Sequence, residues 1–492
     1  MTDAAESSSP RSPARRRRRR RIVLLALLLF GVWLTRWVYL RLTLRPTPRP
    51  EYWTEQIERL DPPPPGAHSF ETAMRNIEQF VSRAQGMGIA YPNTSDWETL
   101  RGASAWKRFP AFDSDAFFQL RQQWIDLARC GWRSPDIEQV DSMYNWDKLT
   151  VSLVPGVRML LDHAVWSLAY KDDADSAVED WLTVARLAQN CGRSRRYMSR
   201  YAENVIHRVL ADDLRRWADE AFSPRPYSIL GTLFSHGRHG PCRCPSIPIA
   251  AFASELDRVM GPELRPQDLC EGERLTLINA LEHLYVREGG DWLDVSEAAQ
   301  FARTWMGGAP GRLGGGGVAP RRTWNLLAPV FHNLAEAKRV VEEQFWYPKG
   351  PATLPQIANP PGGVDCRFVG PLQGFPRFYA YPMEIAVQGY YSSRNDMEGA
   401  TTLLALREFR LANGEFPETL RELVPRFLPR LPIDYGDRGI LRYERRDGGF
   451  ILYSVGWDGV DDGGRFDTLS SDGRLTPDIV FAEILRVVTP HE

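Results

Sequence analysis

Apolar residues recur at intervals of three and four over much of the chain after residue 67, which is the period of an amphipathic α-helix. No 34-residue self-similarity of a tetratricopeptide array accompanies this period. We therefore expect an irregular all-helical domain over residues 67–390. Its first helices are predicted at 70–84, 117–127, 157–168, 178–188 and 198–217. Further helical pieces, separated by loops rich in glycine and proline, are predicted at 251–260, 275–285, 295–305 and 325–345.

The pattern changes near the C-terminus. From about Glu384 a long helical period runs to Asn413 and Gly414, a pair typical of a helix end. Two short apolar segments follow at 440–443 and 450–454, and the residues between them tolerate positive φ, which indicates a β-hairpin. The predicted fold class is therefore mainly α, with a small α+β domain over residues 391–492.

A membrane anchor is predicted at the N-terminus. Seven consecutive arginines, Arg15 to Arg21, precede the apolar segment Ile22 to Leu40. These 19 residues would span about 28 Å as a helix, the thickness of a bilayer core. The arginine run places the N-terminus in the cytoplasm. A cleaved signal peptide is the alternative, but no small-residue cleavage site follows the segment.

The resulting organisation has five parts. An arginine-rich cytoplasmic tail at 1–21 is followed by a transmembrane anchor at 22–44 and a proline-rich linker at 45–66. The helical domain at 67–390 and the α+β domain at 391–492 complete the chain. The expected location is the inner membrane, with a single pass and the bulk of the chain on the periplasmic, extracytoplasmic side.

The net charge of −1 hides an uneven distribution. The first 49 residues contain twelve arginines and two acids, so the remainder of the chain carries about −11. An acidic body repels polyanions, which argues against nucleic acid as a partner. The expected partners are the membrane and a protein that the sequence does not identify.

One acidic loop is a candidate metal site. Asp458, Asp461, Asp462 and Asp467 lie within ten residues and are interleaved with glycines. Calcium takes six to eight oxygen ligands in a flexible shell, so it suits such a loop. The alternative is a solvated acidic turn without a bound ion.

The remaining chemical signals are weaker. The cluster His236, His239, Cys242 and Cys244 has zinc-ligand residue types without the spacing of an ordinary zinc finger, and the competing interpretation is that the six cysteines form disulfides or remain free thiols. The acids from Asp172 to Asp180 are interpreted as helix N-terminal residues that favour the helix dipole. No common catalytic motif occurs, which favours a protein without enzymatic activity but leaves open a catalytic triad built from dispersed residues.

The C-terminal segment resembles the major pseudopilin of type II secretion systems. The likeness covers about residues 395–480 and rests on ordered motifs, namely Ala405 to Pro417, Leu420 to Pro425, Leu431 to Asp434 and Tyr453 to Gly459. It implies a pseudopilin-like fold with a calcium loop, in which Asp458 matches a ligand position best. Asp461 and Asp462 stand for the paired acids, and Asp467 and Asp478 are candidates for the other ligands.

The resemblance stops before filament assembly, because the anchor has no prepilin-peptidase junction and no acid in its apolar helix. The whole chain resembles a group of uncharacterised, membrane-anchored bacterial proteins. The predicted function is a membrane-anchored extracytoplasmic interaction or scaffold protein. The alternatives are an accessory component of a type II secretion-like or envelope assembly, and a hydrolase with its site inside the helical domain.

Overall fold

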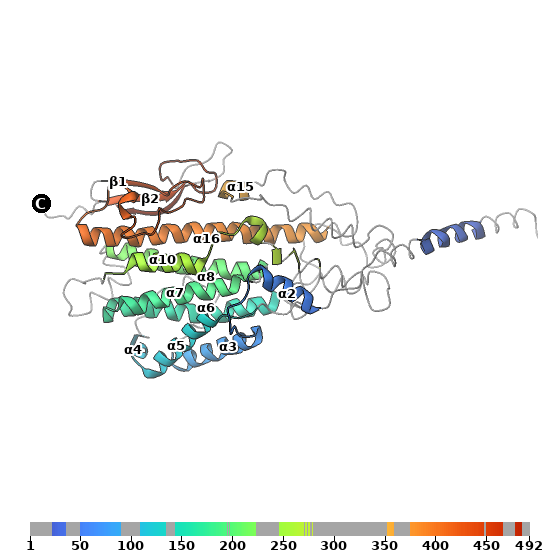
Figure 1. Cartoon of the computed structure of the whole chain (residues 1–492), viewed down its shortest axis with the longest axis horizontal. Helices are drawn as coiled ribbons and strands as arrows, with labels where there is room; N and C mark the ends of the chain where they lie inside the picture. Colours follow the sequence, from blue (N-terminus) through green and yellow to red (C-terminus); the bar gives the residue numbers. More distant parts are fainter. Residues whose placement is uncertain are drawn as a thin grey trace, which may run out of the picture.

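The structure is a computed structural model that is mainly helical, with a small antiparallel sheet at the C-terminus (Figure 1). The residues that it describes are 22–35, 50–89, 109–133, 143–193, 195, 197–222, 246–269, 271–272, 274–275, 278, 352–358, 374–446, 449–465 and 478–484. The predicted fold class is confirmed at this level: a helical body is followed by a small α+β unit.

Residues 22–35, the first part of the predicted anchor, are helical, and their large apolar side chains are exposed. Residues 36–40 of the same segment lie outside the described part of the chain. Within the described residues, no helix combines the length and the apolar character needed to cross a membrane.

The helical body begins with α2 (Pro50–Leu60), which lies inside the predicted linker, and continues with α3 (Phe70–Gly86), α4 (Phe109–Phe112) and α5 (Asp115–Cys130). Ser69 and Ser114 cap α3 and α5, because each hydroxyl accepts a hydrogen bond from a backbone N–H in the first turn. The predicted helices at 70–84 and 117–127 are confirmed.

The central helices are α6 (Met143–Trp166), α7 (Ala174–Gly192), α8 (Tyr197–Phe222) and α10 (Ile249–Met260). A π-helical turn, η4 (Ser167–Lys171), extends α6. The Asp173 carboxylate accepts the Ser176 N–H and caps α7, as expected for an acid at this position. The helices predicted at 157–168, 178–188, 198–217 and 251–260 are confirmed.

A long helix, α16 (Gly374–Asn413), follows the short α15 (Leu354–Ala358). It begins ten residues before the predicted start at Glu384 and ends at Asn413 as expected. Gly414 follows with a φ of +83°, the left-handed conformation that glycine commonly adopts directly after the end of a helix. Because α16 is continuous, it extends across the boundary predicted at residue 390.

The sheet has three antiparallel strands in the order β1 (Arg442–Arg446), β2 (Gly449–Ser454) and β3 (Ile479–Ile484). The predicted hairpin is confirmed, with Arg442 opposite Tyr453. Strand β1 begins two residues later than expected, and β3 was not predicted. A short 3-10 helix, η5 (Leu420–Leu423), connects α16 to the sheet.

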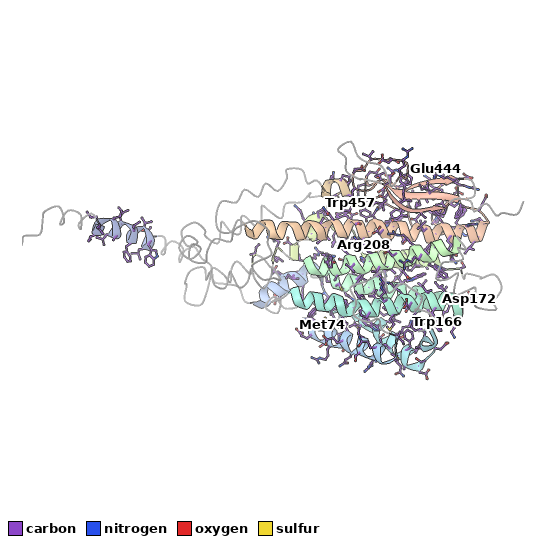
Figure 2. The ribbon with its side chains drawn as sticks, turned by 180° about the vertical axis from the view of Figure 1, so that it is seen from behind. Met74, Trp166, Asp172, Arg208, Glu444 and Trp457 are labelled. Carbon is purple, nitrogen blue, oxygen red and sulfur yellow. The ribbon has the colours of Figure 1, made fainter. Side chains whose placement is uncertain are left out.

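The elements form layers, as Figure 1 shows: the sheet lies on α16, α16 lies on α8 and α10, and α3 and α5 form the far side. Figure 2 places Glu444 of the sheet and Met74 of α3 on opposite sides of these layers. One continuous apolar core runs from Phe70 through Trp181 and Leu404 to Phe481. The body and the C-terminal unit therefore share their interior.

Several predictions fall outside the described residues. These include the arginine run, the helices expected at 295–305 and 325–345 with nearly all of the one at 275–285, and the His236, His239, Cys242 and Cys244 cluster. Within the described chain, Cys130 and Cys191 are free thiols, so these two do not form the disulfides that the competing interpretation included.

Candidate functional site

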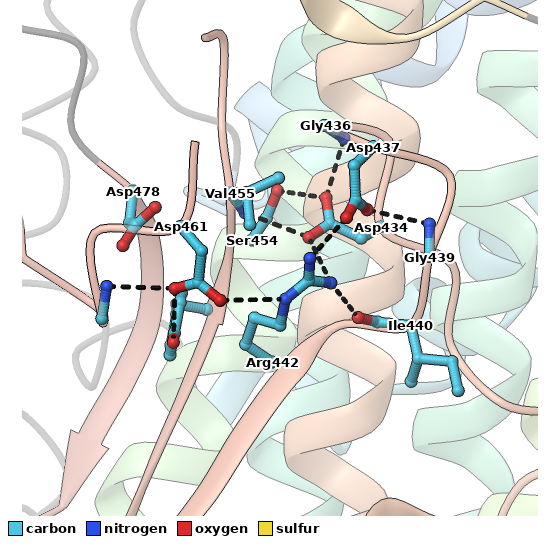
Figure 3. Close-up of polar contacts among 12 residues, drawn as sticks. Asp434, Gly436, Asp437, Gly439, Ile440, Arg442, Ser454, Val455, Asp461 and Asp478 are labelled. Carbon is cyan, nitrogen blue, oxygen red and sulfur yellow. Dashed lines mark hydrogen bonds and ion pairs between the residues drawn. The ribbon is translucent and has the colours of Figure 1, made fainter. Parts of the chain in front are cut away.

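Two acidic loops meet at one end of the hairpin. The loop 434–441 leads into β1, and the loop 455–465 leaves β2. Antiparallel pairing of Arg442 with Tyr453 brings the two loops together, although they are distant along the chain. Figure 3 shows Asp434, Asp437 and Asp461 around Arg442, with Asp478 on the far side of Asp461.

Asp434 holds the two loops together. Its carboxylate is fully buried and accepts hydrogen bonds from Gly436 N at 2.7 Å, Ser454 Oγ at 2.6 Å and Val455 N at 3.0 Å. Burial raises the pKa of this carboxyl, while the three donors act to lower it. Asp434 is therefore a structural residue that fixes the end of β2 against the preceding loop.

Arg442 connects the two loops electrostatically. Its Nε donates to Asp461 Oδ2 at 3.3 Å, and its Nη2 donates to Asp437. Its Nη1 lies 3.6 Å from Asp434 Oδ2. One guanidinium thus interacts with three carboxylates. Arg442 and these three acids together retain a net negative charge.

Asp461 is the best-solvated acid of the cluster. Partial burial acts to raise its pKa, but hydrogen bonds from Gly463 N, the Tyr453 hydroxyl and Arg442 lower it. The Asp461 carboxylate is therefore ionised at neutral pH. Its side chain is 46% exposed, so it is accessible to a cation from solvent.

Asp478, at the start of β3, has the opposite environment. It is only 2% exposed, and its Oδ2 accepts hydrogen bonds from Asp462 N at 3.1 Å and Gly464 N at 2.8 Å. Its Oδ1 has no hydrogen-bond partner among the described residues. Burial raises the pKa of this carboxyl, and the charges of Asp461 and Asp462 raise it further.

The four predicted ligands have different positions. Asp458 forms a local turn, in which its Oδ1 accepts the Val460 N–H at 3.0 Å. Asp461 and Asp462 lie beside Asp478, whereas Asp467 lies outside the described residues. In the described part of the chain, no three His, Cys, Asp or Glu side chains are grouped closely enough to hold a metal ion.

The donor set nevertheless has the chemistry that calcium requires. Carboxylate oxygens are its preferred ligands, and the buried Oδ1 of Asp478 is an acceptor without a hydrogen-bond partner among the described residues. Gly463 and Gly464 have φ values of +75° and +76°, which let the backbone turn tightly around the Asp478 carboxylate. Arg442 opposes binding, because it already neutralises part of the charge on Asp461.

Sequence reasoning missed Arg442 as part of this site. Its distance from Asp461 along the chain hides the pair, and only the register of the hairpin reveals it. The sequence placed Asp434 in the motif Leu431 to Asp434 but assigned the residue no role. The signal that could have identified it was an acid flanked by Pro432 and Gly436, directly before a predicted strand.

A second polar cluster lies inside the helical body. Asp180 is fully buried on α7, where its Oδ1 accepts Arg121 Nε at 2.7 Å and its Oδ2 lies 2.5 Å from His163 Nδ1. Ser167 Oγ lies 3.5 Å from both ring nitrogens of His163. The side chains of Phe112, Phe117 and Trp166 surround the imidazole.

This cluster contains the residue types of a catalytic triad without its geometry. A triad requires the serine to face the ring nitrogen opposite the carboxylate, whereas Ser167 is equidistant from both nitrogens. The serine and histidine are 1% and 6% exposed, so substrate has no access. The cluster is an internal charge network that joins α5, α6 and α7.

A cleft lies between α10, α16 and the segment 428–432. Apolar side chains of Leu256, Met260 and Met397 line it. Arg430 bridges it, with hydrogen bonds to both carboxylate oxygens of Glu398 on α16 and of Asp257 on α10. These contacts tie the C-terminal unit to the body at a second place.

Comparisons with known proteins gave no relative: no family model, no curated protein and no solved structure matches this chain. The pseudopilin resemblance therefore rests on the sequence motifs alone.

Proposed function

We propose that this protein is a membrane-anchored, extracytoplasmic scaffold that presents its helical body and C-terminal sheet to a protein partner. The observation that supports this most is the shared apolar core, which joins α3, α7, α16 and β3 into one unit. A rigid surface of this kind loses little conformational entropy when a partner binds. The best-defined nucleophile cluster, at Ser167 and His163, is sealed from solvent.

Topology is the first part of the proposal to test. Protease added outside the inner membrane should digest the chain after residue 50 while a short N-terminal fragment stays membrane-bound. The arginine run and the apolar segment are the reasons. A soluble mature chain that starts near residue 45 would replace the anchor with a cleaved signal peptide.

Partner binding is the second part. The full chain is captured from membranes after crosslinking, with residues 1–66 alone as the matched control, since these keep the anchor and linker without the body. The same protein should co-purify with the full chain and not with the control. Equal recovery in both captures would attribute binding to the anchor and refute a scaffold role for the body.

We further propose that the loop 458–467 binds calcium together with Asp478, as the cofactor of this module. What supports it is the excess of carboxylates over cations there and the unpartnered Asp478 Oδ1. Because these carboxylates are not grouped closely enough in the described structure, binding would draw Asp461, Asp462 and Asp478 together around the ion, with Asp458 and Asp467 as further oxygen donors. The bound charge would neutralise a group of acids that otherwise repel one another.

Thermal unfolding of the full chain in detergent tests the calcium proposal. Calcium should raise the melting temperature relative to chelator by mass action, and magnesium should do much less, because it demands a tighter octahedron. Asp478→Asn and Asp458→Asn should reduce the rise, whereas Glu444→Gln removes one charge from the same sheet and should keep it. An equal rise in all variants would leave the loop as a solvated turn.

The accessory role in a secretion-like assembly is a second candidate. It is supported by the order of elements, since a long helix followed by a small antiparallel sheet agrees with the pseudopilin resemblance. Co-purification of a secretion-system component in the capture experiment would favour it over a general scaffold.

A further inference from the structure

Three arginines surround Tyr390 where α7 passes into α8. Arg195 precedes α8, Arg200 lies in its first turn, and Arg394 comes from α16. The guanidinium carbons of Arg200 and Arg394 lie 5.7 Å and 5.2 Å from the Tyr390 ring centre. Arg195 interacts electrostatically with both Arg200 and Tyr390. We call Arg195, Arg200 and Arg394 the arginine junction.

Within the described chain, the three arginines make few close ion pairs, although Asp61 and Asp268 also act electrostatically on Arg195. Arg200 pairs with the buried Glu203 at 2.5 Å. Arg394 Nη2 donates to three main-chain carbonyls, of Met260, Gly261 and Pro262, and so caps the C-terminal end of α10. Arg195 likewise donates to main-chain oxygens, those of Leu60 and Asp268. Among the described residues, Arg200 is the member of the junction with a carboxylate at ion-pair distance.

Several donors in the junction lack acceptors. Arg195 Nε, Arg200 Nε and Nη2, and Arg394 Nε have no hydrogen-bond partner among the described residues. Arg200 is only 1% exposed, so water from bulk solvent does not reach its guanidinium. A buried charged donor without an acceptor is strongly unfavourable, because desolvation is not compensated. The junction therefore has donors left over for an acceptor with several oxygens.

The neighbouring groups increase the attraction for an anion. The first turn of α8 contributes the positive end of a 26-residue helix dipole. Arg195 itself has a φ of +51°, an uncommon conformation for a residue with a side chain. Asp61 and Arg193 lie beside the junction with side chains 25% and 19% exposed, and the Asp61 carboxylate, which interacts with Arg195 and Arg200, opposes an anion.

His207 is an additional buried group beside the junction. It is 2% exposed, and its Nε2 has no hydrogen-bond partner among the described residues. Burial, together with the charges of Arg394 and Arg200, keeps this imidazole neutral at pH 7. It can therefore donate one hydrogen bond without adding to the positive charge.

We propose that the arginine junction binds a phosphate-type oxyanion through Arg195, Arg200 and Arg394. Guanidinium groups donate two N–H bonds in a fixed plane, which fits the oxygens of a tetrahedral anion better than a monovalent halide. The phosphate belongs either to a small soluble molecule or to a lipid headgroup. This site is independent of the scaffold role and of the calcium loop.

The test is thermal unfolding of the full chain in mild detergent, with inorganic phosphate added at constant ionic strength set by chloride. Phosphate should raise the melting temperature with a saturable dependence, since it binds only the folded state. Acetate should act more weakly and chloride not at all. Arg195→Gln should weaken the apparent phosphate affinity about tenfold, because one charge-assisted hydrogen bond is lost.

Two more variants separate binding from folding. The double variant Arg200→Gln with Glu203→Gln removes a buried pair together, so neither charge is left alone, and it should abolish the phosphate response. Arg193→Gln removes a charge in the same turn, but its Nε and Nη1 already have acceptors in Asn190 and Pro62, so it should keep the response. An unchanged response in Arg195→Gln and in the double variant would overturn the proposal, as would a response that follows ionic strength alone.

Bilayers of two lipid compositions distinguish a phosphate in a lipid headgroup from a phosphate in a soluble molecule. The chain is placed in bilayer discs of phosphatidylcholine with or without phosphatidic acid, and the phosphate titration is repeated. Loss of the response to free phosphate in discs with phosphatidic acid would identify a headgroup as the ligand. An unchanged response would identify a soluble ligand.

Discussion

Gly399 on α16 packs directly against the ring of Phe481 on β3: a β-carbon at residue 399 would lie 2.4 Å from Phe481 Cδ1. This distance is shorter than any van der Waals contact, so the absence of a side chain lets the sheet approach the helix. Phe481 is 5% exposed and belongs to the core shared with the helical body. The contact is thus one of those that join the two parts of the chain.

Gly399→Ala should destabilise the protein by up to about 2 kcal/mol. Moving the ring or the strand to admit a methyl group costs about 1–3 kcal/mol, and alanine in a helix interior offsets about 1 kcal/mol of this cost. Urea unfolding measures the change. Gly86→Ala is the control, since nothing lies within 4 Å of its added β-carbon. A stabilised Gly399→Ala variant would contradict the close approach of α16 and β3.

Asp434→Asn should destabilise the protein by at least about 2 kcal/mol, because its amide NH2 would face a backbone or hydroxyl donor in place of an accepting oxygen. The native carboxylate satisfies three donors in a fully buried position. Asp458→Asn is the comparison, since Asp458 is partly exposed and accepts one local N–H. Without added calcium, its effect should stay below about 1 kcal/mol. Equal effects in chemical denaturation would refute the structural role of Asp434.

His207 should make the protein sensitive to acid. Burial, with the charges of Arg394 and Arg200, lowers the pKa of His207 to about 3. As the pH falls below about 6.5, the unfolded chain binds a proton that the folded chain does not, so stability is lost progressively down to the folded pKa. His207→Gln removes this term. Its stability relative to wild type should improve on acidification, by up to about 1.4 kcal/mol for each pH unit. A constant difference between pH 7.5 and pH 4.5 would contradict this.

Asp213 should have the opposite pH dependence. Burial raises its pKa to about 7, and the charge of Asp162 adds to this, while the Trp181 Nε1–H bond at 3.3 Å opposes it. The folded state therefore holds a proton that the unfolded state releases above about pH 4, and stability declines as the pH rises toward 7. Asp213→Asn keeps an acceptor for Trp181 and removes the decline. The variant should gain up to about 1.4 kcal/mol relative to wild type for each pH unit between about pH 4 and pH 7, and an unchanged difference would exclude Asp213 as the source.

The helices were predictable because their buried faces repeat locally. The apolar positions from Phe70 to Ala84 form one stripe, and α3 buries that stripe. The start of α16 was missed, because Pro376 and Pro382 with several aromatic residues obscure the period before Glu384. Strand β3 was missed because its partner β2 lies beyond a polar, glycine-containing segment, and pairing with a distant strand leaves no local pattern.

The acidic loop of the candidate site was predictable from the sequence, whereas the residues that reach it from other strands were not. The spacing of Asp458, Asp461 and Asp462 is a local signal, and it identified the loop. Arg442 and the environment of Asp478 depend on the register of the sheet, which the sequence does not contain as a pattern. In the same way, Arg121 and Asp180 are 59 residues apart in the sequence and pair across two helices, so the buried acid was interpreted as part of a helix start.

The central position of α16 has a consequence for synthesis of the chain. The ribosome releases α8 and α10 long before α16, yet both pack against it in the finished molecule (Figure 1). Until α16 has emerged, Asn204 lacks the main-chain oxygen of Ala386 to which it donates, although Asn204 and His207 both end up buried. A nascent chain of this protein therefore exposes part of its future interior while it grows, and we expect chains that stop before Gly374 to need a chaperone to stay soluble.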